Sequence, residues 1–497
     1  MRSEESGSDM QKKIALLIII VFFIAGQIWA QDFGFGFGFD DEESESSGGS
    51  LISSASRTPS VSISGEVSAA ITGYLKEISE GAENINTRDM FQFSGKLNFL
   101  AQSSFAEGVI NLKLVPALVP VSIDEAYIRA YFGSLDLTAG LRKLTWGKAD
   151  QIGPLDIINL PDSSKIFTEM ADNNNLMAIK IANPVIHASY RFGMFSKIEG
   201  VFLPSFEINS MAVSSAISPP DPLMTAIIGP ASPGRWMPAQ MSILNDTINQ
   251  MMIGSSDLQI DDILKMPKTS GLDYAQAGLR FTTTIESADI GAQYFYGRLF
   301  QPAVKAFYVL TPAYEPVISS VEIIFNKYHQ IGFDYAQVLA GFNVRAEVAA
   351  NITEDTKGDN GSVYNPSIGW SLGFDRDIIA GFSVNMQANG SIRLFNDKVG
   401  SENPFAPDYD IEGGTSMTAT RLTAMLSKKF LRDELELRAA VVWGIEDSDF
   451  AVIPALIWMK DDLRVAFSGG FFAGDSEGQL GQYKDNNFLK ISVTYIF

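Results

Sequence analysis

The sequence predicts an all-β fold, a transmembrane antiparallel up-and-down β-barrel of about eighteen strands, within a range of about 16 to 20. Three observations predict it. Most of the 497 residues follow a period of two, long connections alternate with tight ones, and the chain is 46% hydrophobic but only 19% charged. Beyond the N-terminus no apolar stretch is long enough for a membrane helix. A chain this apolar must either bury a very large core or form strands that face lipid.

The first 60 residues divide into two segments that precede the barrel. Lys12 and Lys13 lead into the apolar run 14–26, and small Ala30 follows. This pattern predicts a signal peptide over 1–30, cleaved near Ala30, with an N-terminal anchor helix as the alternative. Residues 31–60 hold a Phe-Gly repeat, an acidic run and then Ser and Gly. They indicate a disordered periplasmic linker, or alternatively a small plug or docking peptide.

Residues 61–497 carry the strand pattern of the barrel domain. Apolar and polar residues alternate from Val61 onward, as they do over 342–349 and 435–443. The last strand places Leu489, Ile491, Val493, Tyr495 and Phe497 on one face. A final amphipathic strand that ends on an aromatic residue resembles the recognition signal of bacterial outer-membrane barrels. Outer-membrane lipid and the barrel-assembly machinery, acting through the Phe497 strand, are therefore expected partners. A soluble two-sheet sandwich is the alternative.

The connections between the predicted strands alternate in length. About twenty runs qualify as strands, but one or two over 297–340 are ambiguous, which leaves about eighteen. In the period-two reading the tight connections fall on one side and the long ones on the other, as in outer-membrane barrels with long extracellular loops. The longest loop, 195–274, contains a predicted short helix with apolar residues at helical spacing (Met241, Leu244, Ile248, Met251). The tight connections are Gly133-Ser134, Asn183-Pro184, Glu286-Ser287 and Lys460-Asp461; the long ones are about 143–174, 195–274, 351–364, 395–416 and 473–487.

The composition excludes several classes of function. A formal charge of −21 argues against nucleic acid as a partner, and the absence of Cys excludes disulfides and thiolate chemistry. The chain has two His. His187 is predicted to lie in a strand at the inward register and His329 in a turn over 326–329, neither beside a nucleophile motif. No phosphate loop or dinucleotide fingerprint occurs. The sequence therefore predicts no enzyme, no cofactor and no metal centre.

If the apolar residues face lipid, basic side chains outnumber acidic ones on the inward face. Such an excess favours anions in a pore. The alternative is that inward charges pair across strands, and pairs two residues apart, such as Arg345 with Glu347 and Arg438 with Glu436, make some neutralisation certain. The pore-lining candidates are Arg129, Arg142, Arg191, Arg280, Arg345, Glu347, Arg421 and Arg438. Further inward charges are Lys96, Lys113, Lys180, Arg393, Arg464, Lys490, Glu66, Glu125, Asp136, Asp289, Asp334 and Glu436.

One segment carries a resemblance to a known family. Trp146-Gly147 is followed by Asp150, and Asp156 by Asn159, Pro161 and Asp162. This pattern resembles outer-membrane barrels related to alginate-export and porin-like proteins, which carry Trp-Gly-x-x-Asp and then Asp-x-x-Asn-Pro-x-Asp. Leu160 interrupts the Asn-Pro pair here. The resemblance implies an outer-membrane channel or exporter-like barrel without enzymatic chemistry.

The same segment is the main candidate for a functional loop. It follows a predicted strand that ends near Arg142, so Asp150, Asp156 and Asp162 could join a charge-assisted network that folds the loop into the pore mouth. Alternatively, these residues only cap turns, or the carboxylates bind calcium. Trp146 is expected to anchor the loop by packing.

Together these features predict a porin-like channel in the outer membrane of a diderm bacterium. It would pass or export hydrophilic solutes, anionic ones among them. One alternative is a non-transporting adhesin or structural barrel that acts through its loops. A second is a transporter of apolar solutes similar to the fatty-acid transporters, although the polar inward residues speak against it.

Overall fold

The computed structural model describes most of the barrel domain. The described residues are 60–75, 91–114, 121–151, 153–159, 176–206, 264–265, 267–300, 303–310, 312, 316–379, 381–398, 417–475, 480–484 and 487–497. The predicted signal peptide, the linker up to residue 59 and the predicted helix around Met241 lie outside them.

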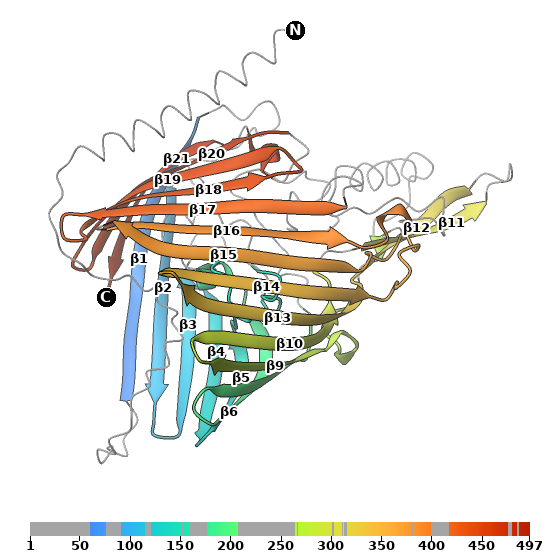
Figure 1. Cartoon of the computed structure of the whole chain (residues 1–497), viewed down its shortest axis with the longest axis horizontal. Coiled ribbons are helices and arrows are strands. Elements are labelled where there is room, and N and C mark those ends of the chain that lie inside the picture. Colours follow the sequence, from blue (N-terminus) through green and yellow to red (C-terminus); the bar gives the residue numbers. More distant parts are fainter. Residues whose placement is uncertain are drawn as a thin grey trace, which may run out of the picture.

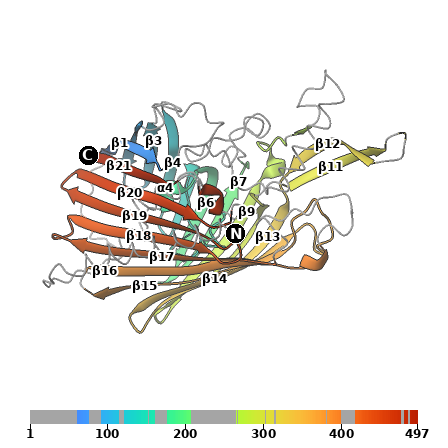
Figure 2. The same cartoon turned by 90° about the horizontal axis from the view of Figure 1, so that it is seen from above.

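Eighteen strands form one sheet that closes on itself (Figures 1 and 2). Successive strands pair antiparallel, and β1 pairs with both β2 and β21, which closes the barrel. The predicted fold class and strand number are confirmed. The strands are β1 (Ser60–Tyr74), β2 (Phe91–Gln102), β3 (Ala106–Leu114), β4 (Ser122–Phe132), β5 (Leu135–Arg142), β6 (Asn183–Phe192), β7 (Ser196–Leu203), β9 (Gln276–Ile285), β10 (Ala288–Arg298), β13 (Lys327–Leu339), β14 (Phe342–Thr353), β15 (Ser367–Ile379), β16 (Phe382–Arg393), β17 (Thr418–Phe430), β18 (Leu435–Gly444), β19 (Asp449–Lys460), β20 (Leu463–Ala473) and β21 (Phe488–Ile496).

A second sheet lies outside the barrel wall. It consists of β8 (Leu264–Lys265), β11 (Ala303–Leu310) and β12 (Pro316–Ile324), with β11 and β12 forming an antiparallel hairpin. Figure 1 shows this hairpin projecting beyond the barrel, in the chain between β10 and β13. It explains the ambiguity over 297–340, because its two strands have strand composition but do not enter the barrel.

The chain reverses tightly at one end of the barrel and runs through longer connections at the other. The β13–β14 turn is Ala340-Gly341, with φ values of 52° and 82°, as a two-residue hairpin turn requires. One predicted turn is wrong. Asn183 and Pro184 begin β6, and the chain reverses at 193–195 instead. Pro184 is tolerated there because it stands near the start of its strand. The predicted long loop 195–274 also starts too early, because β7 occupies 196–203 and pairs with β6 and β9. The short connections are 103–105, 133–134, 193–195, 286–287, 340–341, 380–381, 431–434 and 461–462.

The two faces of the wall differ in polarity in the way the alternation predicts. On β13, Phe333 is 55% exposed on the outward face, whereas Gln330 and Asp334 are 1% and 2% exposed on the inward face. Large exposed apolar side chains recur on the outward face of strand after strand, and an apolar outer band is typical of a barrel that spans a bilayer. No helix in the described ranges combines the length and the hydropathy needed to cross a membrane.

Candidate functional site

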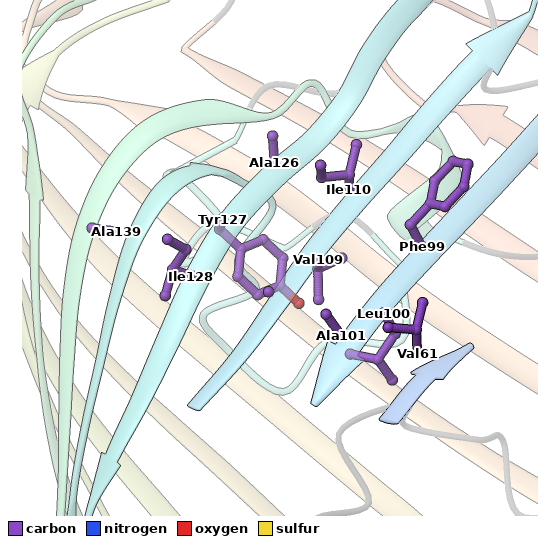
Figure 3. A pocket seen from close by; sticks show the side chains of 11 residues that line it. Val61, Phe99, Leu100, Ala101, Val109, Ile110, Ala126, Tyr127, Ile128 and Ala139 are labelled. Carbon is purple, nitrogen blue, oxygen red and sulfur yellow. The ribbon is translucent and has the colours of Figure 1, made fainter. Parts of the chain in front are cut away.

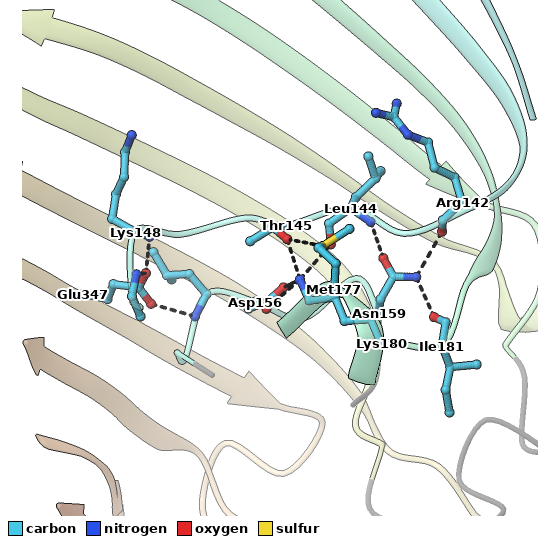
Figure 4. Close-up of polar contacts among 12 residues, drawn as sticks. Arg142, Leu144, Thr145, Lys148, Asp156, Asn159, Met177, Lys180, Ile181 and Glu347 are labelled. Carbon is cyan, nitrogen blue, oxygen red and sulfur yellow. Dashed lines mark hydrogen bonds and ion pairs between the residues drawn. The ribbon is translucent and has the colours of Figure 1, made fainter. Parts of the chain in front are cut away.

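The loop that follows β5 lies inside the barrel and runs along the inner wall. Its described residues, 143–151 and 153–159, contact inward-facing side chains of β10, β13, β14, β16 and β17. Figure 4 shows its anchoring contacts, with Glu347 at one end and Arg142 at the other. This is the segment that the sequence singled out as a functional loop.

Glu347, near the middle of β14, holds the central part of the loop through its backbone. One carboxylate oxygen accepts hydrogen bonds from the backbone N–H groups of Lys148 and Ala149, the latter at 2.7 Å. The other oxygen accepts a longer bond of 3.4 Å from Leu155. Gly147, with φ +100°, lies against the same carboxylate, and a Cβ there would collide with it. The loop therefore wraps tightly around one buried carboxylate.

Arg345, two residues before Glu347, holds the loop through charge. Its guanidinium forms ion pairs with Asp150 of the loop, at 2.5 Å, and with Asp375 of β15. Asn385 of β16 donates a further hydrogen bond of 2.9 Å to Asp150. The expected pair of Arg345 with Glu347 does not form, because Glu347 faces the loop backbone and Arg345 faces the two aspartates.

A buried ion pair fixes the second half of the loop. The ammonium of Lys180 lies 2.8 Å from the carboxylate of Asp156, and it also donates to the Thr145 hydroxyl and the Leu144 carbonyl. Burial raises the pKa of Asp156 above its ordinary value, and the charge of Lys180 opposes that rise. Lys180 follows the short helix α4 (Leu176–Ile179), which brings it back to the loop.

Asn159 closes the base of the loop with three hydrogen bonds to backbone groups. Its side-chain oxygen accepts from the Leu144 N–H at 2.7 Å, and its amide donates to the carbonyls of Arg142 and Ile181. Asn183 repeats this by donating to the Ile158 carbonyl at 2.7 Å. An amide suits these positions because it donates and accepts at once.

Two inward-facing glutamines bind the carbonyls of the loop. Gln293 of β10 donates a hydrogen bond of 3.0 Å to the Leu155 carbonyl, and Gln330 of β13 donates one of 3.0 Å to the Pro154 carbonyl. The two amides also bond to each other at 2.9 Å. Because buried carbonyls are costly without a donor, these side chains offset much of the cost of placing a loop inside the barrel.

Apolar packing completes the docking of the loop. Trp146 is 2% exposed and belongs to a cluster with Leu144 and Ile158 of the loop. Gly278 of β9 makes room for the indole, since a Cβ there would lie 2.7 Å from the ring. The expected anchoring role of Trp146 agrees with this packing. The wall contributes Val185, Val201, Leu203, Phe295 and Tyr328 to the cluster.

A second segment covers the inner wall elsewhere. Leu480 and the 3-10 turn η4 (Gly481–Tyr483) pack on Phe472 and Phe488. The carboxylate of Asp449 accepts a hydrogen bond of 2.6 Å from the Leu480 N–H.

Most of the predicted pore-lining cations are paired with carboxylates. Arg438 pairs with Glu436 at 2.8 Å, as expected from their spacing. Three of the candidates, Arg142, Arg280 and Glu347, are buried at 6%, 4% and 4% exposure, so they stand behind the loop or within the wall. The remaining pairs are Arg129 with Glu107 at 3.4 Å, Arg191 with Asp136 at 3.2 Å, Arg280 with Asp334 at 2.7 Å and Arg421 with Asp447 at 3.9 Å.

Other predicted residues lie beside the loop or outside the described part of the chain. The guanidinium of Arg142 donates a hydrogen bond of 3.2 Å to Thr138 and lies 5.0 Å from the ring centre of Tyr127. Pro161 and Asp162 lie outside the described residues. The described residues hold no cluster of three or more candidate metal ligands.

The two histidines lie in different environments. His187 is buried on the inward face, 3.3 Å from Glu199. His329 is not in a turn as predicted, because β13 begins at Lys327 and carries it on the outward face.

Sequence reasoning missed several inward acids. Asp124 pairs with Lys143 at 2.8 Å and also contacts Lys113. A register shift between Asn111 and Leu112 of β3, opposite this part of β4, lets Asp124 and its neighbour Glu125 both reach inward partners. Strict alternation assigns only one of them inward. Glu107 and Glu199 were also missed, although their positions alternate with apolar neighbours and could have been found. Asp375 was missed as well, because charged Arg376 and Asp377 follow it and interrupt the alternation.

A shallow apolar groove of about 420 Å³ lies outside the lumen (Figure 3). Small residues, Ala101 and Ala139 among them, alternate there with larger ones such as Val61, Phe99 and Ile128. Because these residues belong to the outward face, the groove is not part of a path through the barrel.

Comparisons with known proteins give a general likeness. No protein-family model matches the chain, and no curated protein matches it in sequence. Among solved structures, OccK3 (OpdO) of Pseudomonas aeruginosa aligns with a TM-score of 0.46 and 9% identity over 88% of this chain and 95% of that one. A BenF-like porin from Pseudomonas fluorescens aligns with a TM-score of 0.46 and 7% identity over 88% and 98%. A mutant Rh. blastica porin aligns with a TM-score of 0.38 and 9% identity over 88% and 100%. The resemblance to alginate-export-related barrels stays an expectation from the sequence.

Proposed function

We propose that this protein is a porin-like channel for small hydrophilic solutes in the outer membrane of a diderm bacterium. The observation that carries the proposal is the loop 143–159, which lies inside the closed barrel and is held there by Glu347 and Arg345. A loop that only binds partners at the surface has no need of anchors near mid-wall. A loop along the inner wall narrows the passage and selects solutes by size and charge.

The chemistry of the lumen supports polar solutes over apolar ones. The inward face carries ion pairs such as Lys96 with Glu66, at 2.7 Å, and partly exposed cations such as Arg129. A path for apolar solutes would need an apolar lining, whereas the apolar clusters inside this barrel are buried beneath docked segments.

We infer a weak preference for anions. The basic excess among the inward residues that the sequence predicted favours anions, but the observed pairs reduce that excess because each carboxylate offsets a neighbouring cation. The expected selectivity is therefore smaller than the sequence alone predicts.

The route to the membrane is also proposed from the chain itself. The predicted signal peptide would direct secretion. The terminal strand would then present Phe497 to the barrel-assembly machinery, and its backbone closes the barrel through reciprocal hydrogen bonds of 2.8 and 2.9 Å with Gly65.

Conductance in planar bilayers tests the channel proposal. The purified full chain should give discrete conductance steps, and a salt gradient should give a small reversal potential of anion sign. Insertion without conductance steps at any voltage would overturn the proposal in favour of a structural or adhesive barrel. A clear cation sign would overturn the inferred anion preference alone.

A further inference from the structure

Basic and aromatic side chains gather at one place on the outward face, at the loop-side end of β10 and β13. Tyr296 stands opposite His329, and Arg298 stands opposite Lys327, in the antiparallel register. His329 and Lys327 share the outward face of β13 with Ile331, which is 44% exposed. The cluster therefore lies where the apolar band gives way to the water-facing loops.

The aromatic members fix the imidazole of His329. The Tyr294 hydroxyl lies 2.7 Å from Nδ1, and the Tyr296 ring centre lies 5.0 Å from that of His329. His329 and Lys327 are both exposed. Within the described part of the chain, neither Nε2 of His329 nor Nζ of Lys327 has a hydrogen-bond partner. Two polar groups are thus presented side by side to an outside ligand.

Arg298 is held beside them by the protein backbone. Its guanidinium donates to the carbonyls of Phe325 and Asp273, each at 2.8 Å, and stacks 3.9 Å from the centre of the Tyr274 ring. Among the described residues, the carboxylate hydrogen-bonded to this group is that of Glu354, which accepts from the backbone N–H of Lys327 at 2.8 Å. The carboxylates of Asp273 and Glu322 act on Tyr274, the ring on which Arg298 stacks, so the positive charge presented to an outside ligand is mainly that of Lys327.

The cluster differs in charge from the outward-facing residues at the loop-side ends of other strands. The outward residues near the loop-side end of β2, β7 and β18 are Phe91, Phe202 and Trp443, which are 49%, 38% and 48% exposed. Aromatic residues at this level are typical of a membrane interface. The added cations at β10 and β13 are a local departure that calls for a negatively charged partner.

We propose that this cluster binds the phosphate of an anionic lipid headgroup in the leaflet on the loop side. Lys327, His329 and Arg298 supply the positive and hydrogen-bonding groups that a phosphate accepts. Below them, Ile331 and Phe333 offer exposed apolar surface to the acyl chain of the same lipid. Inorganic phosphate has no apolar part that could contact this surface, so a lipid is the favoured ligand.

Native mass spectrometry of the full chain in nonionic detergent tests the proposal. The probes are phosphatidylglycerol, phosphatidylcholine, whose choline cancels the phosphate charge, and inorganic phosphate. The test variant is Lys327→Gln with His329→Gln; Arg298 is kept because its backbone bonds support the fold. The matched control is Lys428→Gln in β17, an outward cation at the opposite end that lies 5.8 Å from the Phe430 ring centre.

The wild-type chain should retain phosphatidylglycerol more tightly than phosphatidylcholine. The double variant should lose about fivefold in affinity, since a lysine near an anionic surface contributes about 1 kcal/mol, whereas the Lys428 variant should keep wild-type affinity. Equal retention of the two lipids, or unchanged binding by the double variant, would overturn the proposal. Displacement by millimolar inorganic phosphate would overturn the lipid assignment. Thermal melting of each variant checks that it folds. A negative lipid-binding result would leave the channel proposal standing, because conductance tests that proposal separately.

Discussion

The carboxylate of Glu347 accepts a hydrogen bond of 2.7 Å from the backbone N–H of Ala149, a residue 198 positions earlier in the chain. This bond joins the loop after β5 to the wall at β14, and the neighbouring bond from Lys148 doubles it. A carboxylate that binds backbone N–H groups depends little on the identity of the loop side chains. What it requires is a loop backbone free of Cβ atoms at Gly147 and Gly153, both of which lie against Glu347.

Glu347→Gln should loosen the loop without changing side-chain volume. The amide keeps one acceptor oxygen but places an NH₂ group against backbone N–H donors, which costs about 1–3 kcal/mol of loop docking. Single-channel recordings should show larger and noisier conductance. Glu354→Gln is the matched control, because Glu354 also accepts a backbone N–H but is exposed at the surface. Identical recordings for both variants would show that Glu347 does not hold the loop.

Gly278→Ala should push Trp146, and with it the loop, away from the barrel wall at β9. The new Cβ would lie 2.7 Å from the ring of Trp146, so the indole must move. Overpacking of this kind costs about 1–3 kcal/mol. Gly108→Ala offers the control, since nothing lies within 4 Å of a Cβ there. The expected readouts are a changed Trp fluorescence and a lowered melting temperature for the first variant only. Equal melting temperatures would mean that the Trp146 site adapts without strain.

Asn159→Ala should release the base of the loop. The substitution removes the partner of one buried N–H and two carbonyls, at a cost of about 1 kcal/mol or more for each group. Limited proteolysis of the folded barrel should then cut within 143–159 faster than in the wild type. Asn98→Ala, at an exposed position of β2, should leave cleavage unchanged. The importance of Asn159 would be refuted by cleavage at the wild-type rate.

Arg345→Gln should change ion selectivity more than Arg191→Gln. Loss of Arg345 removes the cation that pairs with both Asp150 and Asp375, whereas Arg191 pairs with Asp136 and its side chain is 40% exposed. Reversal potentials in a salt gradient should shift toward cations in the Arg345 variant and much less in the Arg191 variant. A larger shift in the Arg191 variant would place the selective region at that level of the barrel instead.

The barrel was predictable because the alternation of apolar and polar residues within each strand is a local feature of the sequence. Alternation assigns one face to lipid and the other to the lumen, so strands such as 342–349 could be identified without any long-range information. The failures have identifiable causes. Pro184 looks like a turn residue but stands near the first position of β6, and an irregularity in β4, where Asp124 has no register partner on β3, brings Asp124 inward against the alternation.

The docked loop was predictable only in part. Trp146 and Asp150 were recognised as loop residues, but their partners, Gly278 and Arg345, are far away in sequence. Spacing alone cannot assign the partners of a base and an acid on one strand face, which is why Arg345 was expected to pair with Glu347. The glutamines that bind the loop carbonyls, Gln293 and Gln330, give no signal beyond their polar character at inward positions.

The contacts of the loop with β14, β16 and β17 also set an order of events during assembly. Those strands are synthesised long after residues 143–159, and the anchors exist only once the wall has curved round to meet the loop. Bringing together groups so distant in sequence is slow compared with forming hairpins between neighbouring strands. A newly closed barrel should therefore pass through a wide-bore stage, permeable to larger solutes than the finished protein, before its loop settles.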